Sequence, residues 1–239
     1  MTTFQEMLFR RNCFACEFDP AFSYYVYVPE SWRNPELKPR LLVVIHGGER
    51  AAESYRNRLI RFSEETGIFV LVPLFPIRDR LPLATYRTVF ADDTDYSEVL
   101  LHMVEEFGEI FGVSFPQFFI HGFSAGGQFV QRLLYLCPER IAAASIGAPS
   151  EITLPEAEKD WPEGLGPIIL QDEVPPMLEA LKKIPIQVVV GAEDNGSMNG
   201  GPPRIEVSRR LAHLYQNLGC DVQLDDEEPV GHNGFPLLP

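Results

Sequence analysis

Residues 122–126 read Gly-Phe-Ser-Ala-Gly, a spacing that suits a serine nucleophile. The segment fits the pattern G-x-S-x-G and stands between a strand-like stretch, 117–123, and a helix-like stretch, 125–137. In such a turn the serine hydroxyl is exposed, and backbone passing close by excludes side chains two positions to either side. A glycine-rich turn that only packs a helix on a strand is the alternative. The pattern therefore predicts Ser124 as a nucleophile.

A nucleophilic serine needs a general base and an acid that orients the base, because a free hydroxyl is a poor nucleophile. After a turn of this kind, the acid and then the histidine follow in chain order. Glu193 and Asp194 come after the strand predicted at 186–190, and His232 comes after the last predicted strand. We expect Asp194 to be the acid, because Glu193 is expected to point away from the site. His232 is the expected base, with a surface-loop histidine as the alternative.

Backbone N–H groups must stabilise the negative oxygen that forms when a serine attacks a carbonyl carbon. One expected donor is the N–H of Ala125, directly after Ser124. The other is expected from the His-Gly-Gly-Glu loop at 46–49, with Gly48 as the first candidate and Glu49 as the second. Glycine lets this backbone come close to a ligand. The loop and the serine turn together predict an oxyanion hole.

The remaining histidines are expected to have structural roles. His46 is expected to shape a turn, and His121 is expected to be buried beside the site rather than in it. His102 and His213 fall on predicted helices.

Apolar and amphipathic segments alternate along the chain. Strands are predicted at 23–29, 41–45, 68–75, 117–123, 141–146, 186–190 and 221–224. Helices are predicted at 52–66, 95–111, 125–137 and 204–218. Pro73 is expected to end its strand early, and the acids at 92–95 are expected to cap the following helix rather than bind a metal. This alternation favours an α/β fold with a mostly parallel central sheet flanked by helices.

We expect one domain over 1–239, with a small lid inserted at about 149–185. That segment is rich in proline and is too long for a plain connection. A shorter excursion at 76–90 is expected to border the same site. The lid carries apolar side chains that could form a substrate pocket or simply cover the sheet edge: Trp161, Ile168, Ile169, Leu170 and Met177.

The composition excludes several classes of protein. The 239 residues are 45% hydrophobic and include 34 acidic and 20 basic residues, for a net charge of −14. This balance opposes binding to nucleic acids and to anionic membranes, and no run approaches the roughly 20 apolar residues of a membrane helix. Cys13 and Cys16 lack the second pair that a zinc site needs, and the N-terminus lacks the apolar core of a signal peptide. We expect a cytoplasmic protein with reduced thiols and no metal.

The motifs IHGG, GFSAGG, GAED and GHNG occur in an order that resembles the α/β-hydrolase superfamily over almost the whole chain. The SAGG turn and the YYVYVP segment are similar to esterases of the polyhydroxybutyrate-depolymerase-like and feruloyl-esterase-like group. The resemblance implies an α/β-hydrolase fold and a serine esterase with Ser124 as nucleophile, His232 as base and Asp194 as acid. It implies a small-molecule ester as partner and no cofactor. Peptides, thioesters and lactones are alternative substrates of the same triad, and a catalytically silent binding protein is an alternative of another class.

Two departures from the pattern affect the expected site. Glu49 stands where many esterases have a third glycine, and the chain ends seven residues after His232. The histidine loop is therefore expected to be mobile or to be held by another subunit, as in a homodimer. The acidic run at 225–228 is expected to form a solvated face or to repel anionic substrates.

The size of the lid favours small or medium esters over a polymer. The residues expected to contact the substrate are Phe123, Trp161 and Met177.

Overall fold

The computed structural model describes residues 13–34, 36–77, 85–91, 93–198, 200–226 and 228–238. Part of the predicted excursion at 76–90 lies outside these residues. So do Asp92 of the predicted capping cluster and Glu227 of the acidic run.

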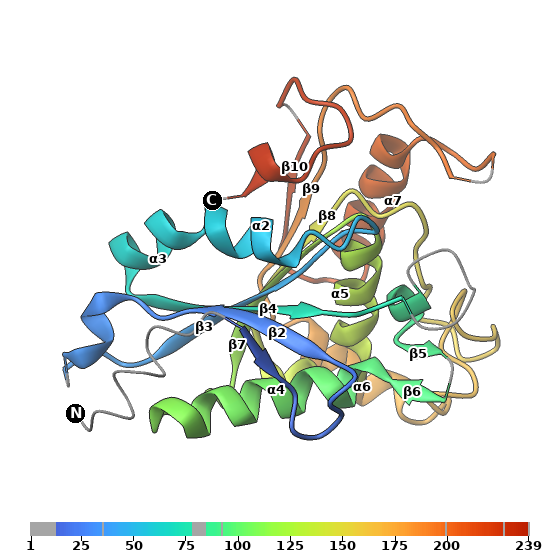
Figure 1. Cartoon of the computed structure of the whole chain (residues 1–239). Helices are drawn as coiled ribbons and strands as arrows, with labels where there is room; N and C mark the ends of the chain where they lie inside the picture. The colour runs from blue at the N-terminus through green and yellow to red at the C-terminus, as the bar shows by residue number, and fades with distance from the viewer. Residues whose placement is uncertain are drawn as a thin grey trace.

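An eight-stranded sheet runs through the middle of the molecule, in the order β1-β2-β4-β3-β7-β8-β9-β10 (Figure 1). β2 is antiparallel to both β1 and β4, and all other neighbours in the sheet are parallel. The strands are Cys13–Ala15 (β1), Ser23–Tyr27 (β2), Arg40–Ile45 (β3), Ile68–Leu74 (β4), Phe118–Phe123 (β7), Ile141–Gly147 (β8), Ile186–Val189 (β9) and Val222–Asp225 (β10). A separate two-stranded sheet pairs Phe90–Ala91 (β5) with Thr94–Asp95 (β6). The predicted mostly parallel sheet is confirmed.

Helices pack on both faces of the sheet (Figure 1). On one face lie Tyr96–Phe111 (α4), Ala125–Leu136 (α5), Val174–Leu181 (α6) and Arg204–Asn217 (α7), and on the other lie Ala52–Arg58 (α2) and Ile60–Thr66 (α3). Short 3-10 turns occupy Glu30–Arg33 (η1), Thr85–Thr88 (η2), Pro138–Arg140 (η3) and Phe235–Leu237 (η4). Leu41 and Val43 join one hydrophobic cluster, whereas Leu42 and Val44 join the other. Successive strand residues point to opposite faces, which explains why β3 is apolar throughout.

Three predicted elements differ from the structure. The helix predicted at 52–66 is two helices, because Leu59 N donates to Arg56 O at 3.2 Å and this tighter turn separates α2 from α3. β4 continues through Pro73, which pairs with β2 beyond the point where the ladder with β3 ends. The predicted lid contains α6, which the sequence analysis did not separate from the irregular chain before it.

The capping prediction for α4 is confirmed. One carboxylate oxygen of Asp95 accepts hydrogen bonds from Ser97 N at 2.9 Å and from Glu98 N at 3.2 Å. These backbone donors have no partner within the helix, so the aspartate stabilises the first turn.

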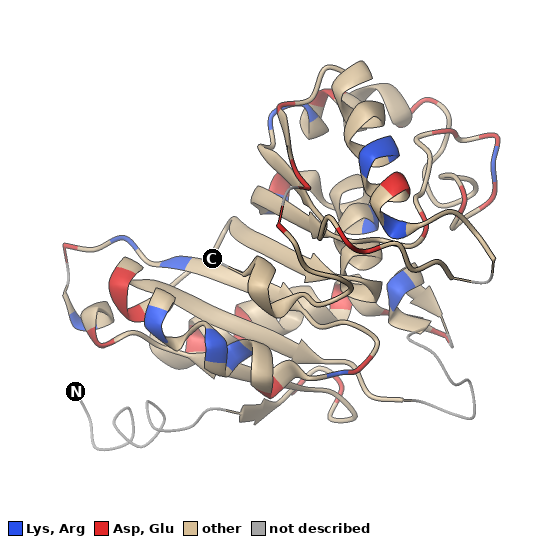
Figure 2. Ribbon diagram, turned by 90° about the horizontal axis from the view of Figure 1, so that it is seen from above, with Lys and Arg blue, Asp and Glu red and all other residues tan. Residues whose placement is uncertain are grey.

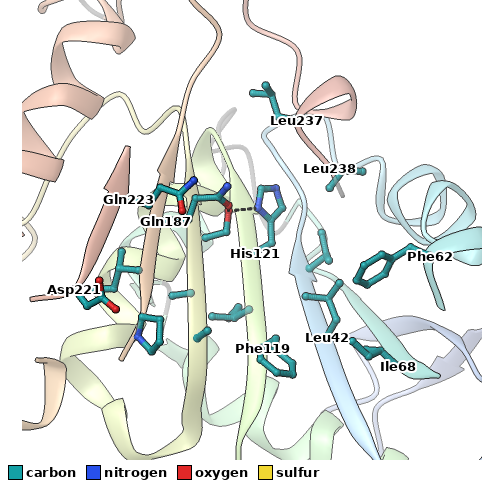
Figure 3. Close-up of a pocket in the computed structure, with 17 residues that line it drawn as sticks. Leu42, Phe62, Ile68, Phe119, His121, Gln187, Asp221, Gln223, Leu237 and Leu238 are labelled. Carbon is teal, nitrogen blue, oxygen red and sulfur yellow. Dashed lines mark hydrogen bonds between the residues drawn. The ribbon is translucent and has the colours of Figure 1, made fainter. Parts of the chain in front are cut away.

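The sheet carries an open groove of about 620 Å³ on the face of α2 and α3 (Figure 3). Leu42 and Phe62 lie on its apolar side, and a row of polar side chains crosses the neighbouring strands. His121 Nδ1 lies 2.9 Å from Ser145 Oγ, which in turn donates to Gln187 Oε1 at 2.7 Å. Because the Ser145 hydroxyl donates its hydrogen to Gln187, Ser145 Oγ accepts a hydrogen bond from the Nδ1–H of His121. Burial lowers the pKa of His121 to about 4, and the residue is a structural part of the sheet, as expected.

Charged side chains lie on the helices as well as on the loops (Figure 2). α4 carries four glutamates and no basic residue, whereas α7 carries three arginines and one glutamate. Among the helices that the structure describes, none is long and apolar enough to cross a membrane.

Candidate active site

Ser124 lies in a sharp turn between β7 and α5. Its backbone has φ 57° and ψ −114°, a conformation that non-glycine residues rarely adopt. Ser124 N donates to Gly147 O at 2.8 Å, and Ser124 O accepts from Gln128 N at 3.1 Å. The surrounding hydrogen bonds thus hold a strained turn of the kind that presents a reactive serine.

The glycines on either side of the serine are required by close backbone contacts. A Cβ atom at Gly122 would lie 2.2 Å from Gly126 O, and one at Gly126 would lie 2.3 Å from Ile45 O. Both distances are far below a van der Waals contact, and both contacted atoms are backbone. The structure therefore shows the steric exclusion that the sequence pattern predicts.

Gly126→Ala should destabilise the protein by about 1–3 kcal/mol, because the new methyl group must push α5 away from the end of β3. The same movement displaces Ser124, and a shift of about 1 Å costs on the order of 100-fold in turnover. Urea unfolding and ester hydrolysis measure the two effects. Gly48→Ala is the matched control for stability, because no atom lies within 4 Å of its added Cβ. Equal unfolding midpoints for the two variants would contradict the steric account.

The structure brings Ser124, His232 and Asp194 together from three separate segments. His232 Nε2 lies 3.0 Å from Ser124 Oγ, and His232 Nδ1 lies 2.6 Å from Asp194 Oδ2. With the serine hydroxyl donating to Nε2 and Nδ1–H donating to the carboxylate, the three groups form a continuous relay. These residues do not line the groove of Figure 3.

Asp194 is buried, whereas the neighbouring Glu193 is exposed. Only 1% of the Asp194 surface is accessible, and its second oxygen, Oδ1, accepts from Arg204 Nη1 at 3.3 Å. One carboxylate oxygen therefore faces the histidine and the other faces an arginine at the start of α7. This arrangement favours Asp194 over Glu193 as the acid. Arg204 was not among the residues predicted from the sequence.

The loop that carries His232 packs against its own chain. The His232 ring lies 4.8 Å from the ring of Phe123, measured between centroids. Further along, the Phe235 ring contacts Tyr55 at 4.9 Å and lies under the Arg58 guanidinium at 4.1 Å. Phe123 is thus a support for the histidine, and it is 4% exposed. α2 anchors the end of the loop.

The buried residue Tyr86 contacts the backbone of the His46 loop through its hydroxyl group. Tyr86 Oη lies 2.7 Å from His46 O and 2.9 Å from Gly47 O, and Phe75 N donates to His46 Nε2 at 3.2 Å. Burial lowers the pKa of His46 to about 4, so its imidazole is neutral and accepts this hydrogen bond. His46 shapes the turn, as predicted, whereas Tyr86 was not among the residues predicted from the sequence.

The expected oxyanion donors lie in the segments that follow two neighbouring strands, β3 and β7. Ile45 at the end of β3 pairs with Gly122 of β7, so the loop with Gly48 and Glu49 and the start of α5 at Ala125 lie at one edge of the sheet. Gly48 and Glu49 are exposed, and Ala125 is the first residue of its helix, where N–H groups and the helix dipole favour an anion. The assignment of the three amides as an oxyanion hole stays a prediction.

The apolar residues of the lid differ in burial. Trp161 Nε1 donates to Thr88 O at 2.6 Å, and its ring packs on Phe90. Met177 on α6 is buried in the hydrophobic cluster. Both side chains have packing contacts, and their expected contact with the substrate stays a prediction. Of the other apolar lid residues, Ile169 is buried, whereas Ile168 and Leu170 are exposed.

The acidic run before His232 is partly engaged by neighbours. Asp225 accepts from the side-chain amides of Gln187 and Gln223, and Asp226 forms an ion pair with Arg209 at 2.7 Å. Within the described part of the chain, no group of three or more His, Cys, Asp or Glu side chains could hold a metal ion.

No family model and no curated protein matches the chain. Solved structures match it well. Poly(aspartic acid) hydrolase-1 from Sphingomonas sp. KT-1 has a TM-score of 0.71 at 24% identity, over 90% of this chain and 89% of that one. The poly(3-hydroxybutyrate) depolymerase from Bordetella parapertussis has a TM-score of 0.69 at 25% identity, over 90% and 80%. A fluorophosphonate-binding serine hydrolase from Staphylococcus aureus has a TM-score of 0.63 at 16% identity, over 88% and 86%. The chain has the α/β-hydrolase fold and is similar to the serine esterases of that superfamily.

Proposed function

We propose that the protein is a serine hydrolase that cleaves carboxylic esters of small or medium size through an acyl-enzyme. The observation that carries this proposal is the hydrogen-bonded relay from Ser124 through His232 to Asp194 on a strained strand–turn–helix. Similarity to a poly(3-hydroxybutyrate) depolymerase supports an ester as the bond that is broken. No cofactor is needed, because the triad supplies both nucleophile and base.

The geometry suggests the order of proton transfers. Ser124 Oγ attacks the ester carbonyl carbon while His232 Nε2 takes its proton, and the oxyanion is stabilised by the amides of Ala125 and of Gly48 or Glu49. The histidine then gives the proton to the leaving alcohol oxygen, and the acyl group stays on the serine. A water molecule, deprotonated by His232, releases the acid and restores the hydroxyl.

We also propose a cytoplasmic location. All four cysteines are free, and Cys16, Cys137 and Cys220 are buried. Thiols that stay reduced are typical of a reducing compartment.

Covalent labelling and ester turnover test the proposed activity together. A fluorophosphonate should add to the protein once, at Ser124, and p-nitrophenyl esters from acetate to long acyl chains should be hydrolysed with a preference for the short ones. Labelling without turnover of any ester would move the reaction to an amide, thioester or lactone. An unchanged mass in intact-protein spectrometry would support the catalytically silent fold instead.

A further inference from the structure

Hydrogen bonds from three side chains hold the short turn η2 beside the His46 loop. Tyr86 Oη contacts the carbonyl oxygens of the His46 loop, as described above. Arg132 Nη1 donates to Arg87 O at 2.6 Å, and Trp161 Nε1 donates to Thr88 O at 2.6 Å. The backbone of Arg87 is therefore held rigidly by α5, the lid and the loop next to the nucleophile.

The side chain of Arg87 has a weak partner. Its Nη1 lies 3.8 Å from Met198 Sδ, and a thioether sulfur is a poor hydrogen-bond acceptor. The residue is half-buried, yet among the described residues no carboxylate lies within ion-pair distance of it. By contrast, Arg140, Arg204 and Arg209 each pair with an acid. A guanidinium in this setting has donors available for an anion.

A chain of contacts through Met198, Ser150 and Gln128 links Arg87 to the segments that carry the catalytic groups. Met198 follows Asp194 by four residues and also contacts Ser150 Oγ at 3.7 Å. Ser150 Oγ accepts from Gln128 Nε2 at 2.7 Å, and Gln128 lies one helical turn, about 6 Å along the axis, after Ser124. The contact between Arg87 and Met198 therefore joins η2 to the loop that follows Asp194.

Arg132 is a second cation, and it contacts the backbone of Arg87. Arg132 is 1% exposed, and it donates to Thr153 Oγ1 at 2.9 Å and to Gln128 Oε1 at 3.4 Å, but it forms no ion pair with a described carboxylate. Burial is the main reason that the pKa of Arg132 is lowered to about 10; Glu151 and Glu163 raise this pKa, whereas Arg87 lowers it. Arg132 still carries its proton at neutral pH. Arg87 and Arg132 are thus two neighbouring cations, of which only Arg87 is partly exposed.

We propose that the Arg87 guanidinium binds a carboxylate group of the substrate, so that the enzyme prefers esters that carry a remote carboxylate over neutral esters of equal length. This proposal rests on the proposed ester hydrolysis. A carboxylate suits the site better than a phosphate dianion, because one accessible guanidinium matches one negative charge and Arg132 is shielded behind it. The anion would replace the contact between Arg87 and Met198, and losing this weak contact costs little free energy.

Matched ester pairs test the proposal. The 4-nitrophenyl esters of adipate and hexanoate differ only in the terminal carboxylate, and the butyrate esters of an ω-hydroxyhexanoate and of hexanol place the same difference in the alcohol. We expect kcat/KM to favour the anionic member of one pair by about 10-fold or more, the range of a hydrogen bond to a charged group.

Arg87→Met should abolish this ratio, and Arg87→Lys should restore part of it. Arg61→Met removes the same charge from an exposed helix position and should leave the ratio unchanged.

A binding measurement separates this proposal from the proposed function. Monoethyl adipate is titrated calorimetrically into Ser124→Ala and into the same variant with Arg87→Met. Weaker binding to the variant that also carries Arg87→Met supports the subsite. This holds even if wild type hydrolyses no ester, because that failure would contradict only the proposed activity. Equal binding to the two proteins, or an ester ratio that Arg87→Met does not change, would overturn the subsite.

Discussion

Ser124→Ala should lower kcat for ester hydrolysis by at least about 10⁴-fold, because the covalent step loses its nucleophile. The remaining rate should reflect only binding and the oxyanion hole, which do not depend on the serine hydroxyl. Ser124 is held through its backbone by Gly147 and Gln128, and both hydrogen bonds survive in the variant. The melting temperature should therefore change little. Steady-state hydrolysis of a p-nitrophenyl ester and thermal unfolding measure the two quantities.

The fluorophosphonate provides the control for this variant. Wild type should gain one adduct and Ser124→Ala none, although both proteins are folded. If the variant kept wild-type turnover, the nucleophile would lie elsewhere and the assignment of the site would be wrong. A large fall in melting temperature would mean that the hydroxyl stabilises the turn, and the loss of activity could not then be read as loss of the nucleophile alone.

The segments that the sequence predicted best are those governed by local rules. β3 reads as a continuous apolar run because both of its faces are covered, and the serine turn is recognisable because Gly122 and Gly126 have no room for a side chain. The predicted helix end at residue 66 is followed by Gly67, which caps α3 with φ 70°, a left-handed conformation that favours glycine. In each case the signal lies in residues that are neighbours in the sequence, even where the contacts that explain it are distant.

Features that depend on distant contacts were not predictable in this way. Tyr86 supports the His46 loop from a position forty residues away, and no spacing marks it as special. Met177 has the composition of a pocket residue, but its helix turns it into the core. Arg204 did offer a signal, because a basic residue in the first turn of a helix opposes the helix dipole and therefore suggests an acidic partner.

Asp194→Asn should slow turnover by about 10⁴-fold, as expected when the acid of such a triad is lost. Arg204 makes the physical reason specific to this chain. Because Arg204 Nη1 donates to Asp194 Oδ1, an asparagine would turn its carbonyl oxygen to the arginine and its NH₂ group to His232. Nδ1 would then have to accept a hydrogen bond, the proton would move to Nε2, and the histidine could no longer take the proton of Ser124.

Glu193→Gln is the matched control, since it removes the same charge from the adjacent, exposed position and should leave kcat within about twofold. The reverse result would make Glu193 the acid. Adding Arg204→Met to Asp194→Asn tests the orientation directly. Without the arginine, the asparagine can present its carbonyl oxygen to His232 and allow the productive tautomer, so the double variant should be faster than Asp194→Asn alone. If it is equally slow or slower, the negative charge of Asp194, rather than the tautomer that it selects, accounts for the loss of rate.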